Sequence, residues 1–396
     1  MTGALSDIRV VSFAQLAQGP FATQIMGDLG ADIVKIEPPG GEWMRSAPER
    51  DEDAQIGLNT IWGDENLSFL AVNRNKRSIE LNLKDDRHKE VAYDLVASAD
   101  VLIENFRPGV MDRLGFDYDD LVDQNPKLVY CSSSGYGTSG PYTDRPAQDI
   151  LLQALSGVMN ITGHADDPPT PVGTTVIDTY TAMQIVVSVL AALYERERTG
   201  EGKQIEVDMM SSAVHLLSQE VTVTANDGEP ARRSRVPGMG HVYLQAPYGV
   251  YKTNDGHLAL SLSPVAEVAE ALEIEELESI TSLEEAYERK DELKRRIEVA
   301  FSEQTTDYWL ERLLERDVWC APVQDLSVIP DDPQVQTNGM IQTLERSNLP
   351  DLDVVSLPFR INGETPPARS QPPQVGEHTD DILVELGYPA GYLDDC

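Results

Sequence analysis

The sequence predicts an α/β protein: a larger domain built on a doubly wound, Rossmann-like parallel sheet, and a smaller α+β domain. The first observation is a β–α–β pattern at the start of the chain. Residues 8–13 form a short apolar run rich in β-branched side chains, and residues 32–37 are predicted to form a second strand. Between them, residues 20–29 show a helical pattern that begins with Pro20 and ends at Gly30. Proline at a helix start and glycine at its end are the residues that these positions favour.

The second observation is that the same alternation continues along the first half of the chain. Strand patterns are found at residues 78–83, 101–105, 128–132 and 204–208, and helical patterns at 85–98 and 175–198. Strands separated by helical segments pair in parallel through right-handed crossovers, which leaves helices on both faces of the sheet. The last of these helices is mostly apolar, so we expect it to be buried between layers.

The smaller α+β domain is predicted from the second half. Residues 226–241 are rich in glycine, proline and arginine, which indicates a linker or a mobile loop. The triplet Asn254-Asp255-Gly256 is a strong hairpin signal. Charged helical patterns cover residues 265–316, and residues 331–373 are rich in proline and are predicted to be irregular.

The charge balance excludes one class of function and suggests an environment. The 396 residues include 67 acidic against 31 basic residues, for a formal net charge of -36. The acids are spread through the chain rather than gathered in the blocks or tails of an acidic partner-binding protein. Such a surface needs counterions to stay compact, so we expect a salt-adapted protein of a high-salt cytoplasm. The same field opposes nucleic-acid binding.

Cysteines and apolar runs predict a soluble cytoplasmic protein. The three cysteines, Cys131, Cys320 and Cys396, are too few and too scattered for a disulfide framework or a zinc site. The histidines show no metal-ligand spacing, so we expect no metal. No secretory signal is visible at the N-terminus. The longest apolar run, residues 185–194, is about half the length that spans a bilayer, so no membrane partner is expected.

Two short motifs argue against common enzyme classes. Residues 135–140 match GxGxxG, but a loop sequence follows them instead of the helix that would hold a dinucleotide's pyrophosphate. Residues 132–135 follow a predicted strand without forming the GxSxG of a hydrolase. We therefore expect neither a nicotinamide or flavin cofactor nor a hydrolase nucleophile.

A few carboxylates and scarce basic residues remain as candidates for chemistry. Asp166 and Asp167 lie in the polar turn 162–170, where solvated turn acids are the simpler interpretation. Asp149 stands in the apolar run 147–159 and is either a helix N-cap or a partly buried acid. Five basic residues either pair with the acidic surface or, near strand ends, serve a phosphorylated ligand. These are Arg74, Lys76, Arg77, Arg107 and Arg113.

Beyond these patterns, the chain resembles the class III coenzyme A transferases, the family that contains formyl-CoA and carnitine CoA transferases. The resemblance rests on eight segments in the family's order, spanning nearly the whole chain. They are LAQGPFATQIMGDLGADIVKIEPPGGEWMR, NRNKRSIELNLK, VLIENFRPGVMDRLGFDYDDL, SSGYGTSGPY, RTGEGKQIEVDM, APYGVYKTNDGHLALS, CAPVQDLSVIPDDPQVQTNGMI and GEHTDDILVELGY.

The resemblance implies a set of site residues. The family carries its nucleophilic aspartate in a segment resembling TGxxDGPP, where Asp166 matches the aspartate and Asp167 replaces the usual glycine. The implied oxyanion contacts are near Gln18 and Gly19, and the implied mobile glycine loop contains Gly238 and Gly240. Pro38 stands where some members place a phosphate-binding arginine, so Arg45 or Arg74 is expected to substitute. The implied CoA contacts are Ala17, Pro20, Asn73, Lys76, Arg77, Asn105, Phe106, Arg113 and Tyr136.

The resemblance also implies the domain limits and the assembly. The large CoA-binding domain would comprise residues 1–205 and 326–396, followed in the chain by a linker at 206–225 and the small domain at 226–325. Two copies would interlace as a homodimer. The CoA thioester would be a substrate, and no resident cofactor is implied.

The implied activity is transfer of CoA between an acyl-CoA and a small carboxylic acid, through an aspartyl anhydride and an aspartyl-CoA thioester. A haloarchaeal type of member that passes CoA from succinyl-CoA to mesaconate or a related dicarboxylate fits the acidic composition; formyl/oxalyl exchange is another possibility. Two alternatives stay open. A 2-methylacyl-CoA racemase or epimerase of the same fold would have histidine at position 148, where this chain has Gln148. The other is a non-catalytic CoA-binding protein.

Overall fold

The computed structural model describes residues 3–45, 61–62, 65–229, 231–346 and 349–394. Cys396 and Pro230, which the sequence interpretation included, lie outside these ranges. The chain divides into two compact units. The first, called the sheet unit, comprises Met1–Leu152, Thr175–Leu216 and Asp332–Cys396. The second unit comprises Gln153–Thr174 and Leu217–Asp331. The domain limits inferred from the sequence, which gave residues 153–174 to the large domain, remain a prediction.

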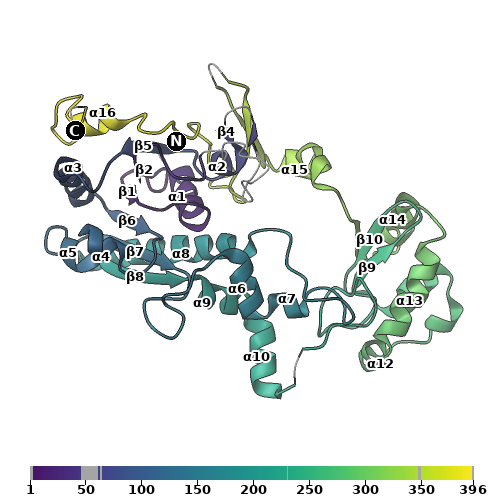
Figure 1. The fold of residues 1–396 in the computed structure, drawn as a ribbon. Coiled ribbons are helices and arrows are strands. Elements are labelled where there is room, and N and C mark those ends of the chain that lie inside the picture. The colour runs from purple at the N-terminus through teal and green to yellow at the C-terminus, as the bar shows by residue number, and fades with distance from the viewer. Residues whose placement is uncertain (1–2, 46–60, 63–64, 230, 347–348, 395–396) are drawn as a thin grey trace, which may run out of the picture. The chain divides into compact units, whose positions relative to one another are not determined.

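The sheet unit is built on six parallel strands in the order β5-β2-β1-β6-β7-β8 (Figure 1). The strands are β1 (Arg9–Ser12), β2 (Asp32–Glu37), β5 (Lys76–Glu80), β6 (Val101–Glu104), β7 (Val129–Ser134) and β8 (Lys203–Asp208). The order runs outward in both directions from β1 and β6, which is the doubly wound arrangement. The parallel α/β sheet predicted from the sequence is confirmed.

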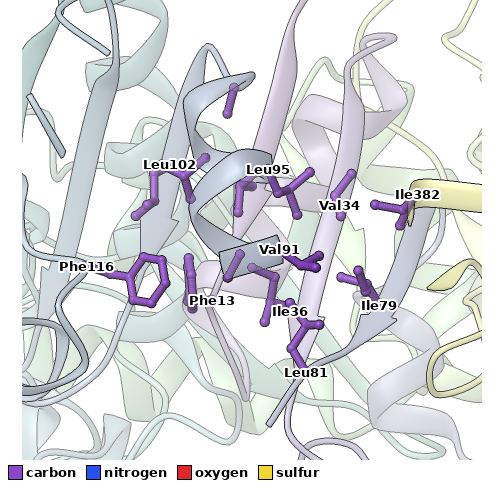
Figure 2. Close-up of a cluster of buried hydrophobic side chains, with 14 of the residues drawn as sticks. Phe13, Val34, Ile36, Ile79, Leu81, Val91, Leu95, Leu102, Phe116 and Ile382 are labelled. Carbon is purple, nitrogen blue, oxygen red and sulfur yellow. The ribbon is translucent and has the colours of Figure 1, made fainter. Parts of the chain in front are cut away.

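Alternate strand residues supply the two cores on either face of the sheet, because successive side chains of a strand point to opposite faces. Val11 and Leu102 belong to one buried cluster, while Val10 and Val101 belong to the other. Figure 2 shows the first cluster, which includes Phe13 and Leu102, Val91 and Leu95 of α3 (Asp86–Ala97), and Ile382 of the last helix.

The opposite face is covered by α1 (Gln18–Asp28) and α8 (Val176–Thr199). Within the described residues, α8 is the one helix long and apolar enough to cross a membrane. Its residues Ile185, Val186 and Val189 are buried against the sheet, as expected for the core helix of an α/β domain. The sequence-based expectation of a helix buried between layers is confirmed for this face of α8.

The remaining elements of the sheet unit are short. They are β3 (Ile61–Trp62), β4 (Glu65–Asn66), α2 (Leu67–Ala71), α4 (Val110–Leu114), α5 (Tyr118–Leu121), α6 (Asp149–Ser156), α9 (Met209–Leu216), α15 (Pro333–Thr337), β12 (Ile341–Leu344), β13 (Leu352–Val355) and α16 (Thr379–Glu385). The unit boundary falls inside α6, after Leu152.

The prediction that residues 331–373 are irregular is wrong in part. The segment contains α15 and the antiparallel pair β12–β13. Leu344, Leu352 and Val354 are buried with Met44 and Phe69, which lie in the first 70 residues of the chain. Strands of four residues between prolines give little sequence pattern, and this partnership across the chain is what stabilises them.

The second unit carries the antiparallel sheet β11-β10-β9 and its own core. Its elements are α7 (Val158–Ile161), α10 (Ser218–Asp227), β9 (Gly249–Lys252), β10 (His257–Leu260), α11 (Val265–Leu272), η1 (Glu275–Leu277), α12 (Leu283–Glu288), α13 (Lys290–Phe301), α14 (Thr306–Leu314), β11 (Cys320–Pro322) and η2 (Leu326–Asp331). The hairpin expected at Asn254-Asp255-Gly256 is confirmed as the β9–β10 connection. Its Asp255 carboxylate accepts hydrogen bonds from the backbone N–H and the hydroxyl of Thr306.

Candidate active site

Residues 13–17 connect β1 to α1, and the predicted oxyanion contacts, Gln18 and Gly19, are the first two residues of α1. Gln18 is the first residue of α1 and is buried, and its side-chain oxygen accepts a hydrogen bond of 3.0 Å from the Ser133 hydroxyl of β7. Gly19 is required by packing, because a Cβ added there would lie 2.4 Å from the Ala14 Cβ. The start of a helix presents backbone N–H groups that have no partner within the helix. The turn therefore offers hydrogen-bond donors beyond the carboxyl end of the sheet.

The segment after β6 clamps this turn. Asn105 accepts a hydrogen bond of 2.9 Å from the Gln15 backbone N–H and donates one of 2.8 Å to the Gln15 carbonyl. The predicted contacts Asn105 and Ala17 thus belong to adjoining segments of one edge. Because Asn105 uses both groups of its amide on Gln15, its observed task is to hold the turn, and direct contact with CoA stays a prediction.

Glu104 precedes this clamp and is a buried acid that the sequence interpretation did not single out. Its carboxylate accepts a hydrogen bond of 2.8 Å from the backbone N–H of Phe106. Burial raises the pKa of Glu104 to about 8, and the charge of Asp117 adds to the rise. Polar residues at strand ends are a general signal for such sites, but only the fold shows that this one is buried.

Asn73 and Lys76 lie beneath the start of α1. The Lys76 ammonium donates to the carbonyls of Pro20 at 2.8 Å and Val72 at 2.9 Å, and to the Asn73 side-chain oxygen at 2.8 Å. Both side chains are buried, and burial, followed by the charge of Lys35, lowers the pKa of Lys76 well below its ordinary value. The pair fixes Pro20, and its direct contact with CoA remains a prediction.

Arg77 is not brought together with residues 17–20. Its guanidinium binds Asp32, the first residue of β2, and Glu385 of α16, both at 2.7 Å. Arg9, the first residue of β1, pairs with the same two acids. The Arg77 side chain therefore reaches to the ends where the parallel strands begin, whereas residues 17–20 follow the end of β1.

The two arginines expected to replace the arginine missing at Pro38 are also engaged. Arg45 forms two hydrogen bonds with the Glu37 carboxylate, of 2.6 and 2.5 Å. Arg74 is buried and pairs with Asp28 at 2.6 Å. Each guanidinium has a structural task in the sheet unit, and neither is free to move to a phosphate without breaking an ion pair.

Three other predicted contacts are accessible. Phe106 is half-buried at the end of β6, and Arg113 is exposed on α4. Tyr136 follows β7; its hydroxyl donates to the Pro146 carbonyl at 3.4 Å, and its ring meets Tyr142 edge-on. The loop after the GxGxxG match is confirmed, because turns rather than a helix follow Gly140.

Asp166 lies in the second unit, in a turn held at several points. Arg233 donates to the carbonyls of Thr162 at 3.0 Å, Asp167 at 2.8 Å and Pro168 at 3.2 Å. The Ala165 N–H donates to the Ser234 carbonyl at 2.7 Å. Asp166 is exposed, and its carboxylate forms no hydrogen bond or ion pair with any residue that the structure describes.

The neighbouring acid behaves differently. The Asp167 carboxylate lies 3.0 Å from Nδ1 of His164, and the Asp167 N–H also points to that nitrogen at 3.1 Å. Asp167 is therefore part of the turn's internal structure, whereas Asp166 presents a carboxylate to solvent. Of the two acids that the sequence left as alternatives, Asp166 has the geometry of an available nucleophile.

Asp149 combines the two interpretations that the sequence left open. It is buried, and its Oδ2 accepts hydrogen bonds from the backbone N–H groups of Ile177 at 2.7 Å and Asp178 at 3.1 Å. It therefore caps α8 from its place in α6. Burial, and then the charge of Asp149, raise the pKa of Asp178 to about 7. Sequence reasoning missed Asp178 because this contact joins residues 29 positions apart.

The predicted glycine loop lies against β9. The Val250 N–H donates to the Gly238 carbonyl at 2.6 Å, and the Gly240 N–H donates to the Tyr248 carbonyl at 3.3 Å. Gly238 has φ +85°, and a Cβ there would lie 2.4 Å from the Val250 carbonyl oxygen. The glycine is thus required by local backbone packing, and motion of this loop stays a prediction.

Comparisons with known proteins agree with one family over nearly the whole chain. The sequence model described as CoA-transferase family III matches residues 5–379. The chain is 34% identical to a succinyl-CoA:mesaconate CoA-transferase of Haloarcula marismortui, with 98% of each chain covered. It is also 34% identical to an acetyl-CoA:oxalate CoA-transferase of Acetobacter aceti, covering 98% of this chain and 97% of the other. A crystal structure of a CaiB/BaiF family protein from Brucella suis superposes with a TM-score of 0.84 at 28% identity, covering 98% of this chain and 100% of that one.

Proposed function

Because this chain belongs to CoA-transferase family III, we propose that it moves CoA between an acyl-CoA and a small carboxylic acid, with Asp166 as the nucleophile. The observation that carries the assignment is the exposed Asp166 carboxylate, which has no partner among the described residues, in a turn whose carbonyls are held by Arg233. The family and the relatives support transfer to small acids. Succinyl-CoA and mesaconate are the first pair to test, since a relative of that name is 34% identical over the whole length.

The proposed reaction conserves the thioester's energy in two covalent intermediates. An oxygen of Asp166 attacks the thioester carbonyl, the C–S bond breaks, and CoA leaves as the thiolate with the electron pair. The product is a mixed anhydride between Asp166 and the donor acid. The thiolate then attacks the Asp166 carbonyl carbon, which releases the donor carboxylate and leaves an aspartyl-CoA thioester. The acceptor carboxylate reverses the two steps and departs as the new acyl-CoA.

The chain's other residues would bind and stabilise rather than react. Each attack produces a negatively charged oxygen, and backbone N–H groups at the start of α1, near Gln18 and Gly19, are donors of the kind that stabilise it. No resident cofactor enters this scheme, because the CoA thioester is itself a substrate. Contacts of CoA with Ala17, Phe106, Arg113 and Tyr136 belong to the same proposal.

We propose in addition that two copies form the working enzyme and that it acts in a salt-rich cytoplasm. Several large apolar side chains of the sheet unit are exposed in the single chain. They include Ile150, Leu151, Met183, Val187 and Tyr194. Exposed apolar residues on neighbouring helices are typical of surfaces that a partner covers. Sedimentation or native mass spectrometry in high salt tests the homodimer, and a monomer at assay concentration would contradict it.

The decisive experiment follows CoA transfer from acyl-CoAs to a panel of dicarboxylates in high salt, with three variants. We expect Asp166→Asn to abolish transfer, because an amide cannot form the anhydride. Asp167→Asn and Asp149→Asn are the matched controls, and each should retain activity of the same order as the unaltered protein. Loss of transfer in a control but not in Asp166→Asn would place the nucleophile elsewhere.

Trapping distinguishes the reaction class. Hydroxylamine added during turnover should leave a hydroxamate on Asp166, because an anhydride or thioester there is an activated carboxyl. Incubation in deuterated water without an acceptor acid tests the racemase alternative, which would introduce deuterium α to the thioester. Deuterium uptake without a hydroxamate would overturn the transferase mechanism, and neither signal with tight CoA binding would indicate a non-catalytic binder.

A further inference from the structure

The turn between β1 and α1 contains a strained residue. Leu16 has φ +67°, in the left-handed region that residues other than glycine rarely adopt. Such a conformation persists only where the surroundings impose it, and it is common at functional sites. Leu16 lies two residues before Gln18, so its conformation sets the direction in which the N–H groups of the following residues point.

A buried ion pair holds this residue. The Leu16 N–H donates to Oε2 of Glu42 at 2.7 Å, and Oε1 of Glu42 lies 3.1 Å from the Lys35 ammonium. Lys35 in turn donates to the Ala14 carbonyl at 2.7 Å. The two side chains are only 1% and 2% exposed, so the pair is shielded from water. The Lys35 ammonium thus holds the turn at Ala14, and the Glu42 carboxylate holds it at Leu16.

Among the described residues, no other acid is free to take the place of Glu42 in this contact. Oε1 of Glu42 is buried and has no hydrogen-bond donor within them, and the Lys35 ammonium is its ion-pair partner. Glu37, the next acid, is already bound by Arg45 and by the Ser78 hydroxyl. Glu37 also accepts the Glu42 N–H at 3.2 Å, which fixes the Glu42 backbone. A buried charge pair that loses one partner leaves the other uncompensated, so the arrangement depends on both.

We propose that Glu42, together with Lys35, is a positioning residue for CoA transfer: it holds Leu16 in its left-handed conformation and so aims the N–H groups at the start of α1 toward the reacting thioester carbonyl. The inference rests on the proposed function, because the thioester is the substrate assigned there. Glu42 itself is buried behind the turn and touches neither substrate. Its effect on catalysis passes through the backbone of residues 14–19.

A carboxylate is required because one oxygen accepts the Leu16 N–H and the other faces the Lys35 ammonium. In Glu42→Gln one oxygen becomes an NH₂ group, which would face either the Leu16 N–H or the Lys35 ammonium, donor against donor. In Glu42→Asp both oxygens remain, on a side chain one methylene shorter. The two variants therefore separate the loss of the contact with Leu16 and Lys35 from a loss of stability.

Asp100→Asn is the matched control. Asp100 also accepts one backbone N–H, that of Arg9 at 2.9 Å, and pairs with one cation, Arg196, at 2.9 Å. It precedes β6, at the end where the strands begin, so it has no contact with residues 14–19. Its side chain is more exposed, at 29%, so the losses of kcat in the two variants are compared at the same loss of thermal stability.

The test measures transfer kinetics and amide hydrogen exchange on the full chain in high salt. We expect Glu42→Gln to lower kcat by about 10- to 100-fold, as misdirected catalytic groups do, with less than about threefold change in KM for the acyl-CoA. Glu42→Asp should lose less, and Asp100→Asn less than about threefold. Exchange in the peptide covering residues 14–20 should quicken in Glu42→Gln and not in Asp100→Asn.

Each outcome of these measurements decides either the proposal or the function on which it rests. Equal kcat losses in Glu42→Gln and Asp100→Asn at equal thermal midpoints, with exchange at residues 14–20 unchanged, would overturn the proposal. If Glu42→Gln cannot be purified in folded form, Glu42→Asp carries the same comparison. An unaltered protein that transfers CoA to no acid in the panel would refute the proposed function, and the exchange data would still decide whether Glu42 holds the turn. Faster exchange with unchanged kcat would show that the turn has no part in catalysis.

Discussion

The candidate basic residues fall into two groups, those whose side chains have partners and those whose side chains have none among the described residues. Arg45, Arg74 and Arg77 are held by carboxylates, and Lys76 by carbonyls and an amide. Arg107 and Arg113 are exposed, and their guanidinium groups form no hydrogen bond or ion pair with the residues that the structure describes. In a chain with 31 basic residues against 67 acids, an unpaired guanidinium beyond a strand end is rare enough to be informative. If CoA's phosphates bind the sheet unit after β6, these two residues are the available partners.

Glu104 makes the stability of the chain depend on pH. In the folded state its carboxyl keeps its proton up to about pH 8, whereas in the unfolded chain it would lose the proton near 4.5. Unfolding therefore releases a proton between these values, and the free energy of unfolding falls as pH rises through this window. We expect Glu104→Gln to be about as stable as the unaltered protein at pH 5. At pH 8.5 it should be more stable, by on the order of a few kcal/mol.

Thermal or denaturant unfolding at the two pH values measures this difference. Glu201→Gln is the control, because Glu201 is exposed and also lies in the sheet unit. Asp178, which also titrates in this range, is common to all three proteins and cancels in the comparison. A Glu104→Gln variant whose advantage does not grow with pH would show that Glu104 is ionised in the folded protein.

At the scale of elements, the regular strands were predictable and the contacts between distant segments were not. The strand at residues 32–37 was predicted with the limits of β2, because its β-branched residues Ile33, Val34 and Ile36 favour a strand. Asp85 begins α3 by accepting from the Arg87 N–H, a local signal that sequence carries. The same is true of Gly200, which ends α8 with φ +74°.

The candidate site shows the limit of such reasoning. Resemblance selected Asp166, and geometry adds that this acid is available whereas Asp167 is engaged. The burial of Asn73 and Lys76 could not be foreseen, because a charged residue at a strand start is usually exposed. Glu42 gave no signal either, since its partners Leu16 and Lys35 are joined to it only by the fold.

The N-terminus of α8 depends on a residue of another helix. Its own N-cap position, Thr175, provides no side-chain hydrogen bond, and Asp149 accepts from Ile177 and Asp178 instead. We expect Asp149→Ala to lower the free energy of unfolding by about 1–3 kcal/mol, because two buried N–H groups lose their acceptor. Asp149→Asn, which keeps an acceptor oxygen, should lose less than half of that. Denaturant titration of the two variants measures this, and equal losses would mean that the carboxylate's charge, not its oxygen, stabilises the helix.

At the scale of the whole molecule, charge governs the response to solvent. A net charge of -36 on 396 residues means that nearly every region repels its neighbours when ions are dilute. Buried pairs such as Lys35–Glu42 are shielded from salt, whereas the repulsion between exposed carboxylates is not. Added salt should therefore weaken the repulsion more than it weakens the buried pairs.

This asymmetry predicts that the protein is more stable in concentrated salt. Repulsion reaches about 10 Å in 0.1 M salt and about 3 Å in 1 M. Raising KCl from about 0.1 M to about 2 M should raise the thermal midpoint by about 3–5 °C, the shift that a few kcal/mol produces in a chain of this size. The gain should be steepest below about 1 M, where screening changes most.

Two controls separate screening from other effects of salt. Sucrose at equal osmolarity changes hydration but screens no charge. It should therefore raise the thermal midpoint much less than KCl does. Lowering the pH toward the sequence pI of about 4.3 removes the net charge by protonation, and the dependence on KCl should shrink with it. Because Glu104 keeps its proton up to about pH 8, it adds nothing to the charge lost in this range. A thermal midpoint that is the same in dilute and concentrated KCl at neutral pH would show that the distributed acids do not repel one another enough to matter, and that the acidic composition has another cause.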